Sequence, residues 1–408
     1  MQTITSLILG MLAVSQTADL SESWRDYPAC SLLEAAQPSE DLTRQKIDAG
    51  LEACALPMDD ISPDGATRVL GDHRFAFEAD PETGVLTLYA RPHDINARLR
   101  VSGLSVELTP ISDTLAAGRF RLAHMNSAML TFYLPPNLAE NGRFQIVNWR
   151  GAEAPPLRMR VAALEGQVER VELHSEALGE TRRLEIYTPP DFDPAAGPYP
   201  AIFMADGGQT AYFAYLIETG IQMGELEPLV IIGLVSGDRG IVDEADPDVD
   251  WRNADYLPGW HEAEPRFEQH LSFVTDEVAP WAVEHYAISE DPARRLVMGH
   301  SSGGVFALHA GYRRPDQFGW AFPFSPGRVA LNTLDFGTEG QARFRLGVGR
   351  YEPRFNVSAQ NSHALLIERG YDSEFTEFSA GHTDDIRNAV LIDWLGEAFP
   401  PPAPAHQP

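Results

Sequence analysis

The chain has 408 residues, more than one domain usually needs, so its length predicts at least two domains. Its formal net charge of −28 at pH 7 argues against nucleic acid and anionic membranes as partners. Hydrophobic residues make up 44% of the chain, enough for sizeable cores. No apolar stretch reaches the roughly 18 residues that a membrane span requires, so we expect no membrane insertion.

The beginning of the chain resembles a secretory signal peptide, with an apolar stretch from Ile4 to Val14 and small residues at its end. No lysine or arginine precedes that stretch, and a buried first helix is the alternative. We expect residues 1–15 to be removed and the protein to be periplasmic or secreted. The two cysteines, Cys30 and Cys54, follow closely, and a cysteine pair in an exported chain favours a disulfide. Two buried free thiols are the alternative if the chain is not exported.

The next two segments differ in their hydrophobic pattern. Residues 16–62 have a helical pattern that breaks at Pro38, and the disulfide would join its two halves. In residues 63–164 the pattern changes to short alternating strands, as in FAFEADPETGVLTLYARP. Several such strands at this spacing predict a β-sandwich domain. The prolines of GAEAPPLRM then mark a linker.

Strands alternate with helices across residues 165–400. The continuous apolar runs YPAIFMADGG and LEPLVIIGLVSG are typical of strands buried on both faces of a parallel sheet. An amphipathic helix over residues 266–286, interrupted at Pro280, is followed by the strand RRLVMG and the helix SGGVFALHAGYRR. This repeating order predicts an α/β fold with a mainly parallel sheet. Residues 401–408 are a proline-rich tail that we expect to be disordered.

The pentapeptide GHSSG at residues 299–303 fits the pattern G-x-S-x-G, with Ser301 in the central position. It lies between an expected strand and an expected helix, where a sharp turn lifts a serine to the carboxyl edge of a sheet. This context predicts that Ser301 is a nucleophile. A plain glycine-rich turn is the alternative.

A nucleophilic serine needs a base and a group that orients the base. In this fold the chain order is serine, acid, histidine. His382 lies in a loop before the last expected helix, whereas His363 lies within a helix and His406 in the tail. Glu352 follows the strand RFRLGVG and is the preferred acid. Asp372 is its competitor, but it precedes the next strand and should lie at the opposite edge of the sheet.

An oxyanion hole needs two backbone donors. We expect one from the N–H of Ser302 and the other from Gly207 or Gly208 in MADGGQ. Aromatic residues near these segments could line an acyl or aryl pocket, although aromatic residues are more often part of a core. The candidate pocket residues are Trp251, Arg252, Tyr256, Trp260 and Tyr212.

The segments YPAIFMADGG, DWRNADYLPG, FVTDEVAPWAVEHY, LVMGHSSGG, LGVGRYEPRF and AGHTDD together resemble the putative-esterase family, which includes esterase D-type enzymes and enterochelin esterases. The resemblance covers Arg182 to Phe399 and implies an α/β-hydrolase domain. It also implies a triad of Ser301, Glu352 and His382, with neither metal nor cofactor. The preceding β-rich segment is similar in placement to the sandwich domain of the enterochelin esterases. The N-terminal helical segment and an acidic loop at 238–260 depart from the family pattern.

The sequence therefore predicts an exported serine carboxylic-ester hydrolase that works through an acyl-enzyme intermediate. Siderophore-type or other aryl or acyl esters are the expected small-molecule substrates. A carbohydrate acyl esterase or an acyltransferase would use the same residues. A catalytically silent protein that binds a glycan or a siderophore is the alternative from a different class. The oligomeric state stays open.

Overall fold

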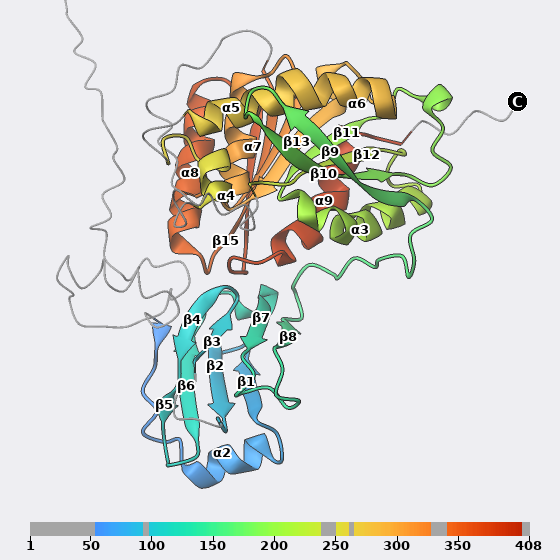
Figure 1. The fold of residues 1–408 in the computed structure, drawn as a ribbon. Helices are drawn as coiled ribbons and strands as arrows, with labels where there is room; N and C mark the ends of the chain where they lie inside the picture. The colour runs from blue at the N-terminus through green and yellow to red at the C-terminus, as the bar shows by residue number, and fades with distance from the viewer. Residues whose placement is uncertain (1–53, 93–97, 238–249, 261–264, 328–340, 402–408) are drawn as a thin grey trace, which may run out of the picture.

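The computed structural model describes residues 54–92, 98–237, 250–260, 265–327 and 341–401. The expected signal peptide, most of the expected helical segment and nearly all of the tail lie outside these ranges. Figure 1 shows two parts, a smaller N-terminal one built on two sheets and a larger one built on a single sheet.

The smaller part contains two four-stranded antiparallel sheets. The first has the order β1 (Phe75–Asp80), β2 (Val85–Ala90), β6 (Ala116–Arg121), β5 (Thr109–Pro110). The second has the order β4 (Leu104–Glu107), β3 (Arg98–Val101), β7 (Met129–Leu134), β8 (Gln145–Arg150). Leu88, Leu99 and Phe132 come from both sheets and are buried in one hydrophobic core, which we call the N-terminal core.

A helix that sequence reasoning did not predict, α2 (Pro63–Leu70), precedes the first sheet. The signals for it are local. The hydroxyl of Ser62 accepts a hydrogen bond from the N–H of Gly65, and Gly71 ends the helix at φ +54°. Ala66 and Leu70, four residues apart, form its buried face. The strand pattern expected from residue 63 onward therefore begins one helix later.

Eight strands form the sheet of the larger part: β9 (Gln167–Ser175), β10 (Glu180–Thr188), β11 (Ala201–Ala205), β12 (Val230–Leu234), β13 (Arg295–His300), β14 (Trp320–Phe324), β15 (Arg343–Gly349) and β16 (Ser373–Phe378). Their order is β16-β15-β14-β13-β11-β12-β10-β9. Pairing is parallel from β16 to β12 and antiparallel between β12, β10 and β9. The sheet is thus mainly parallel, in agreement with the expected α/β pattern.

Helices cover both faces of this sheet (Figure 1). One face carries α5 (Arg266–Ser272), α6 (Ala279–Tyr286), α7 (Ser302–Arg313) and α8 (Pro353–Glu368), and the other carries α3 (Thr210–Gln222) and α9 (Asp385–Ala398). A short helix, α4 (Trp251–Tyr256), lies beside α5 and α7. Successive strand residues face opposite cores, as Ile202 and Phe203 do, which explains the continuous apolar runs of the sequence.

The helix expected over residues 266–286 is one helical run with an irregular centre. A π-helical segment, Phe273–Val278, joins α5 to α6. Pro280 falls in the first turn of α6, directly after this π-helical segment, so the residue that has no N–H to donate lies where the helical hydrogen-bond pattern changes. The 3-10 turns of the described chain include Met125–Ser127, Pro194–Ala196, Gly207–Gln209 and Pro292–Arg294.

Cys54 is fully buried in the N-terminal core and is disulfide-bonded. Cys30, the other cysteine of the sequence, lies outside the described residues. Within the described ranges, no helix is long and apolar enough to cross a membrane. Nor does that part of the chain bring three or more His, Cys, Asp or Glu side chains together as a metal site.

Candidate active site

Ser301 lies at the sharp turn between β13 and α7, at the carboxyl end of a central strand. Its backbone has φ 61° and ψ −124°, a combination that residues other than glycine rarely adopt. The N–H of Ser301 donates to the carbonyl oxygen of Phe324 at the end of β14, 3.0 Å away. The turn therefore holds Ser301 at the edge of the sheet in a strained conformation, as a nucleophile elbow requires.

The glycines around Ser301 are needed because backbone segments cross there. A Cβ on Gly299 would lie 2.2 Å from the carbonyl oxygen of Gly303. One on Gly304 would lie 2.4 Å from the carbonyl oxygen of Phe324, and one on Gly303 would lie 2.9 Å from the Cβ of Ala205. Any larger residue at these positions would push the strand and the helix apart.

His382 and Glu352, which lie on different loops, are brought together at the same edge. Nδ1 of His382 lies 2.5 Å from Oε2 of Glu352, whose side chain is buried. The other carboxylate oxygen accepts hydrogen bonds from the hydroxyl of Ser325 and the N–H of Gly349, both at 2.5 Å. A carboxylate bound at Nδ1 fixes the ring and leaves Nε2 as the nitrogen that can act as a base.

The imidazole of His382 also contacts two rings. Its centroid lies 4.3 Å from that of His300 and 4.0 Å from that of Phe355. Because His300 directly precedes Ser301, the first contact brings the imidazole beside the strained turn. Burial, together with the nearby His382 and two arginines, holds the pKa of His300 well below its usual range, so His300 is neutral at pH 7.

The competitor Asp372 and the two aspartates that closely follow His382 have different partners. Asp372 precedes β16 and forms an ion pair with Arg345 at 3.1 Å. Asp384 pairs with Arg387, and Asp385 accepts a hydrogen bond from the hydroxyl of Thr383. Each of them is engaged away from the imidazole that Glu352 binds.

The expected oxyanion segment follows β11 and begins at Asp206, which has a left-handed φ of 59°. Gly207 is buried, and a Cβ there would lie 2.3 Å from the carbonyl carbon of Gly233 on β12. Gly208 has open space where its Cβ would be. Ser302 is the first residue of α7, so its N–H has no acceptor within the helix. Backbone donors are therefore available on both sides of Ser301.

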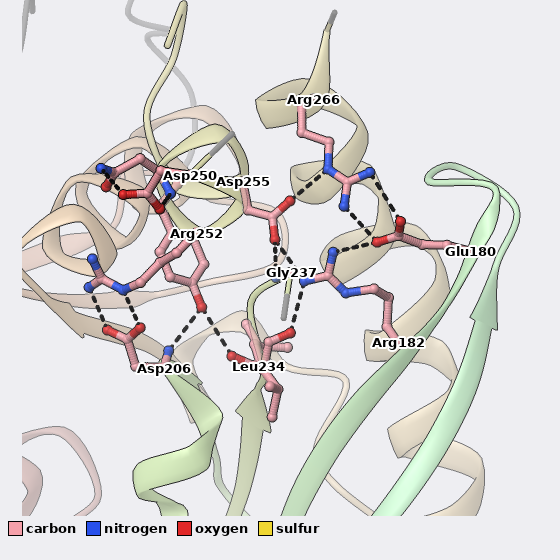
Figure 2. A network of polar contacts seen from close by, with 12 residues as sticks. Glu180, Arg182, Asp206, Leu234, Gly237, Asp250, Arg252, Asp255 and Arg266 are labelled. Carbon is pink, nitrogen blue, oxygen red and sulfur yellow. Dashed lines mark hydrogen bonds and ion pairs between the residues drawn. The ribbon is translucent and has the colours of Figure 1, made fainter. Parts of the chain in front are cut away.

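Residues of helix α4 bind the oxyanion segment and hold it in place (Figure 2). Nε and one terminal nitrogen of Arg252 bind the two carboxylate oxygens of Asp206 at 2.6 and 2.8 Å. The hydroxyl of Tyr256 accepts from the N–H of Asp206 and donates to the carbonyl oxygen of Leu234. A forked pair of this kind fixes orientation as well as distance, so α4 holds the oxyanion segment in register with β12.

Helix α4 is itself held by a buried charge cluster, also drawn in Figure 2. Asp255 is fully buried and accepts from Arg182 at 2.7 Å and Arg266 at 2.8 Å, and both arginines also reach Glu180. Burial by itself raises a carboxyl pKa, but His270 and the two arginines hold the pKa of Asp255 below its usual range. The carboxylate therefore stays ionised, and its ion pairs join α4 to β10 through Arg182 and to α5 through Arg266.

The five residues proposed for a substrate pocket do not share one environment. Tyr256 is fully buried and braces the oxyanion segment instead of facing a ligand. Arg252 forms an ion pair with Asp206, and the ring of Trp251 packs against the guanidinium of Arg266 in the charge cluster. Trp260 and Tyr212 are exposed, at 52% and 42% of their surface, and are the two that a ligand can reach most easily.

Sequence reasoning did not single out four residues that the site uses. Ser325 binds the acid, and His300 packs on the histidine ring. Asp206 receives the α4 arginine, and Asn253 accepts a hydrogen bond from the hydroxyl of Ser302. Only Asp206 carried a usable signal, since it follows an expected strand directly in MADGG. The other three are recognised only by their contacts.

The family model described as "Putative esterase" matches residues 175–382, about half of the chain. The chain is 26% identical over 214 residues to the uncharacterized protein YbbA of Bacillus subtilis. This alignment covers 49% of this chain and 84% of that protein. It is 27% identical over 281 residues to the iron(III) enterobactin esterase of Dickeya dadantii, covering 60% of this chain but only 58% of that protein's length.

Solved structures with the same fold include an enterobactin esterase from Shigella flexneri. Its structure in the presence of enterobactin has a TM-score of 0.59 at 17% identity, and the match covers 84% of this chain and 99% of that one. The ferric enterobactin esterase of Salmonella typhimurium has a TM-score of 0.57 at 16% identity, over 79% and 97% of the two chains. These matches extend across both parts of the molecule.

Proposed function

Because the chain belongs to the putative esterase family, we propose that it is a serine carboxylic-ester hydrolase with Ser301 as its nucleophile. One arrangement carries the proposal. His382 is fixed at Nδ1 by Glu352, and its ring lies against His300, the residue before Ser301. A histidine oriented by a carboxylate beside a serine on a strained turn is the combination that nucleophilic catalysis requires.

The first half of the reaction forms an acyl-enzyme. The hydroxyl oxygen of Ser301 attacks the ester carbonyl carbon while Nε2 of His382 takes the hydroxyl proton. Glu352 stabilises the resulting imidazolium through its hydrogen bond at Nδ1. When the tetrahedral intermediate collapses, the bond to the alcohol oxygen breaks and His382 gives that oxygen the proton. The acyl group is then bound to Ser301.

Backbone N–H groups stabilise the negative oxygen of that intermediate. The N–H of Ser302 is one donor, and the N–H of Gly207 or Gly208 is the other. The open space beside Gly208 and the ion pair that holds Asp206, two residues earlier, support a rigid, accessible donor on this side. Water activated by the same histidine then attacks the acyl carbonyl and releases the acid.

We further propose siderophore-type or other aryl and acyl esters as substrates. The relationship to a protein named an iron(III) enterobactin esterase supports that class. The exposed Trp260 and Tyr212 would contact an aryl group, while Arg252 binds Asp206 in the oxyanion segment and Trp251 precedes it on α4. A carbohydrate acyl esterase or an acyltransferase would use the same catalytic residues, and a substrate panel separates these activities.

The organisation of the chain supports an exported, two-domain enzyme. We propose a signal peptide at residues 1–15, a helical segment with a disulfide at 16–62, a β-sandwich at 63–164 and the hydrolase domain at 165–400. The shared core of the two antiparallel sheets supports the sandwich, and the disulfide-bonded Cys54 supports export to the periplasm or beyond.

Labelling with a fluorophosphonate tests the class of protein. A serine hydrolase should react stoichiometrically, peptide mapping should find the label on Ser301, and Ser301→Ala should abolish labelling. An unlabelled, folded protein that still binds a siderophore or a glycan would identify a silent binding protein instead. For the labelled protein, hydrolysis of aryl, acetyl-sugar and catecholate-siderophore esters, with and without an acceptor alcohol, identifies the reaction.

A further inference from the structure

The loop that carries His382, residues 379–385, lies against the N-terminal sheets along most of its length. The N–H of Met129, at the start of β7, donates to the carbonyl oxygen of Ser379 at 2.8 Å. Further along β7, the hydroxyl of Thr131 donates to the carboxylate of Asp385 at 2.7 Å. These bonds fix both ends of the loop to a single strand of the other part of the molecule. Figure 1 shows that strand facing the lower edge of the large sheet.

The middle of the loop contacts the turn between β3 and β4. The N–H of His382 donates to the carbonyl oxygen of Ser102 at 2.9 Å. Gly103 has a φ of +86°, and a Cβ there would lie 2.9 Å from the carbonyl oxygen of His382 and 3.0 Å from its Cβ. A Cβ on Gly381 would lie 2.0 Å from the Ser102 carbonyl oxygen. The two backbones therefore meet at a distance that only glycine permits on either side.

The proposed acid is fixed to the same part of the molecule. Tyr351, which directly precedes Glu352, is 1% exposed, and its side chain belongs to the N-terminal core. Its hydroxyl donates to the carbonyl oxygen of Ala123 at 2.7 Å. Its N–H donates to the carbonyl oxygen of Ala380, which joins the acid loop to the histidine loop. The base and the acid are thus held against one surface.

We propose that the N-terminal sheets position the histidine and the acid for catalysis, with Gly103 and Tyr351 as positioning residues. This inference rests on the proposed function, since it assigns a task relative to His382 and Glu352. Within the described residues, the backbone of Ser301 bonds to β14 and α7 of the larger part, so the contact of the histidine loop with β3, β4 and β7 sets the distance between nucleophile and base. A misplacement of about 1 Å can lower the rate of a chemical step by about 10².

Gly103→Ala is the principal test, and Gly370→Ala is its matched control. Gly370 has nearly the same φ, +83°, but nothing lies within 4 Å of its Cβ position. Both substitutions place an alanine at a similar positive φ, whereas only the first pushes on His382. We expect Gly103→Ala to lower kcat for an aryl acetate about tenfold to hundredfold with KM unchanged. Gly370→Ala should keep the wild-type kcat.

Hydrogen exchange of the full-length chain gives a readout that does not depend on activity. Amides in a peptide covering 379–385 should exchange faster in Gly103→Ala than in the wild type or in Gly370→Ala. Tyr351→Phe keeps the ring in the core and removes only the hydroxyl, so it serves as a second variant if the alanine substitution does not fold. It should lower kcat to a smaller extent, again without a change in KM.

The outcomes separate this inference from the proposed function. Wild-type kcat and wild-type exchange in Gly103→Ala would overturn the inference while leaving the esterase assignment intact. Equal losses of kcat in Gly103→Ala and Gly370→Ala would also overturn it, because strain alone would then explain the effect. If the wild type hydrolyses no ester, the proposed function fails, and the exchange of residues 379–385 alone decides whether the turn holds the loop.

Discussion

Glu352 lies 2.5 Å from Nδ1 of His382 and is held on its other oxygen by Ser325 and Gly349. Both oxygens of the carboxylate are therefore occupied, and neither can rotate away from the imidazole without breaking a hydrogen bond. The contact joins the loops that follow β15 and β16, which are neighbours in the sheet. Its chemical value is the fixed orientation of the ring.

Glu352→Gln should lower kcat by about 10² to 10⁴, because an amide cannot stabilise the imidazolium and can impose the wrong tautomer. Asp372→Asn is the control. Asp372 is half exposed and pairs with Arg345, so its replacement should change kcat little. Steady-state hydrolysis of an aryl ester measures both variants. A large loss of kcat in Asp372→Asn, together with a nearly unchanged kcat in Glu352→Gln, would show that the acid is misassigned.

Ser301→Ala should abolish hydrolysis, with a loss on the order of 10⁶ by analogy with the triad serine of subtilisin. Ser302→Ala should lose far less, because its backbone donor survives and only the hydrogen bond to Asn253 disappears. Circular dichroism should show both variants folded. Equal kinetic losses in the two variants would contradict the assignment of the nucleophile.

Arg252→Lys should lower kcat through the oxyanion segment. Lysine cannot reproduce the forked contact with Asp206, so the segment loses its fixed orientation. The loss should stay below about 10² to 10³, the effect of removing an oxyanion donor outright. Arg158→Lys, which alters the ion pairs with Glu225 and Asp393 away from the site, should leave kcat unchanged. Combining Arg252→Lys with Asp206→Asn should give a loss smaller than the product of the two single losses.

His270→Phe should reduce the acid sensitivity of the fold. Burial lowers the pKa of His270 to about 3, and neither ring nitrogen has a hydrogen-bond partner among the described residues. As pH falls from about 6.5 towards 3, the unfolded chain binds a proton that the folded chain does not, so this residue lowers stability progressively. Urea unfolding should show the advantage of the phenylalanine variant growing between pH 7 and pH 4.

Two observations check that interpretation of His270. The phenylalanine ring should fit, since His270 already packs edge-on against Tyr256 and also contacts Phe306. His174→Phe, at an exposed position, should keep the pH dependence of the wild type. A stability difference between the His270 variant and the wild type that is the same at every pH would point to packing instead of titration.

Intact-mass analysis of the exported protein should find Cys30 and Cys54 joined and residues 1–15 absent. The bridge closes a loop of about 24 residues, which the chain-entropy model values at roughly 3 kcal/mol. Reduction should therefore lower the melting temperature of the protein. Two free thiols in the mature protein would refute the disulfide, and a retained N-terminus would argue against the signal peptide.

Local patterns predicted the parts of the site that depend on short segments. The glycines around Ser301 lie within six consecutive residues, 299–304, between a strand and a helix, so the short motif itself indicates their role. The choice of Glu352 over Asp372 followed from which end of a strand each residue occupies. The helix α2 was missed although Ser62 and Gly71 carried the cap signals, because the strands that follow dominated the pattern.

The remaining features join residues that are distant in sequence. Gly103 meets His382 across more than half of the chain, and Tyr351 is buried in a core made of residues from the first third. Periodicity describes which face of an element is apolar, but not which other element covers it. The same limit explains Tyr256, whose aromatic character fits a pocket and a core equally well until its burial is known.

The backbone of Ser301, at φ 61° and ψ −124°, is the mirror image of an ordinary extended conformation, which glycine alone adopts without strain. A residue held this way lowers the stability of the fold by about 1 to 3 kcal/mol. Activity and thermal robustness are therefore in opposition at this one position. If Ser301 is the nucleophile proposed above, a Ser301→Gly chain should be inert and should melt at a higher temperature, so selection for thermal stability alone would remove this serine.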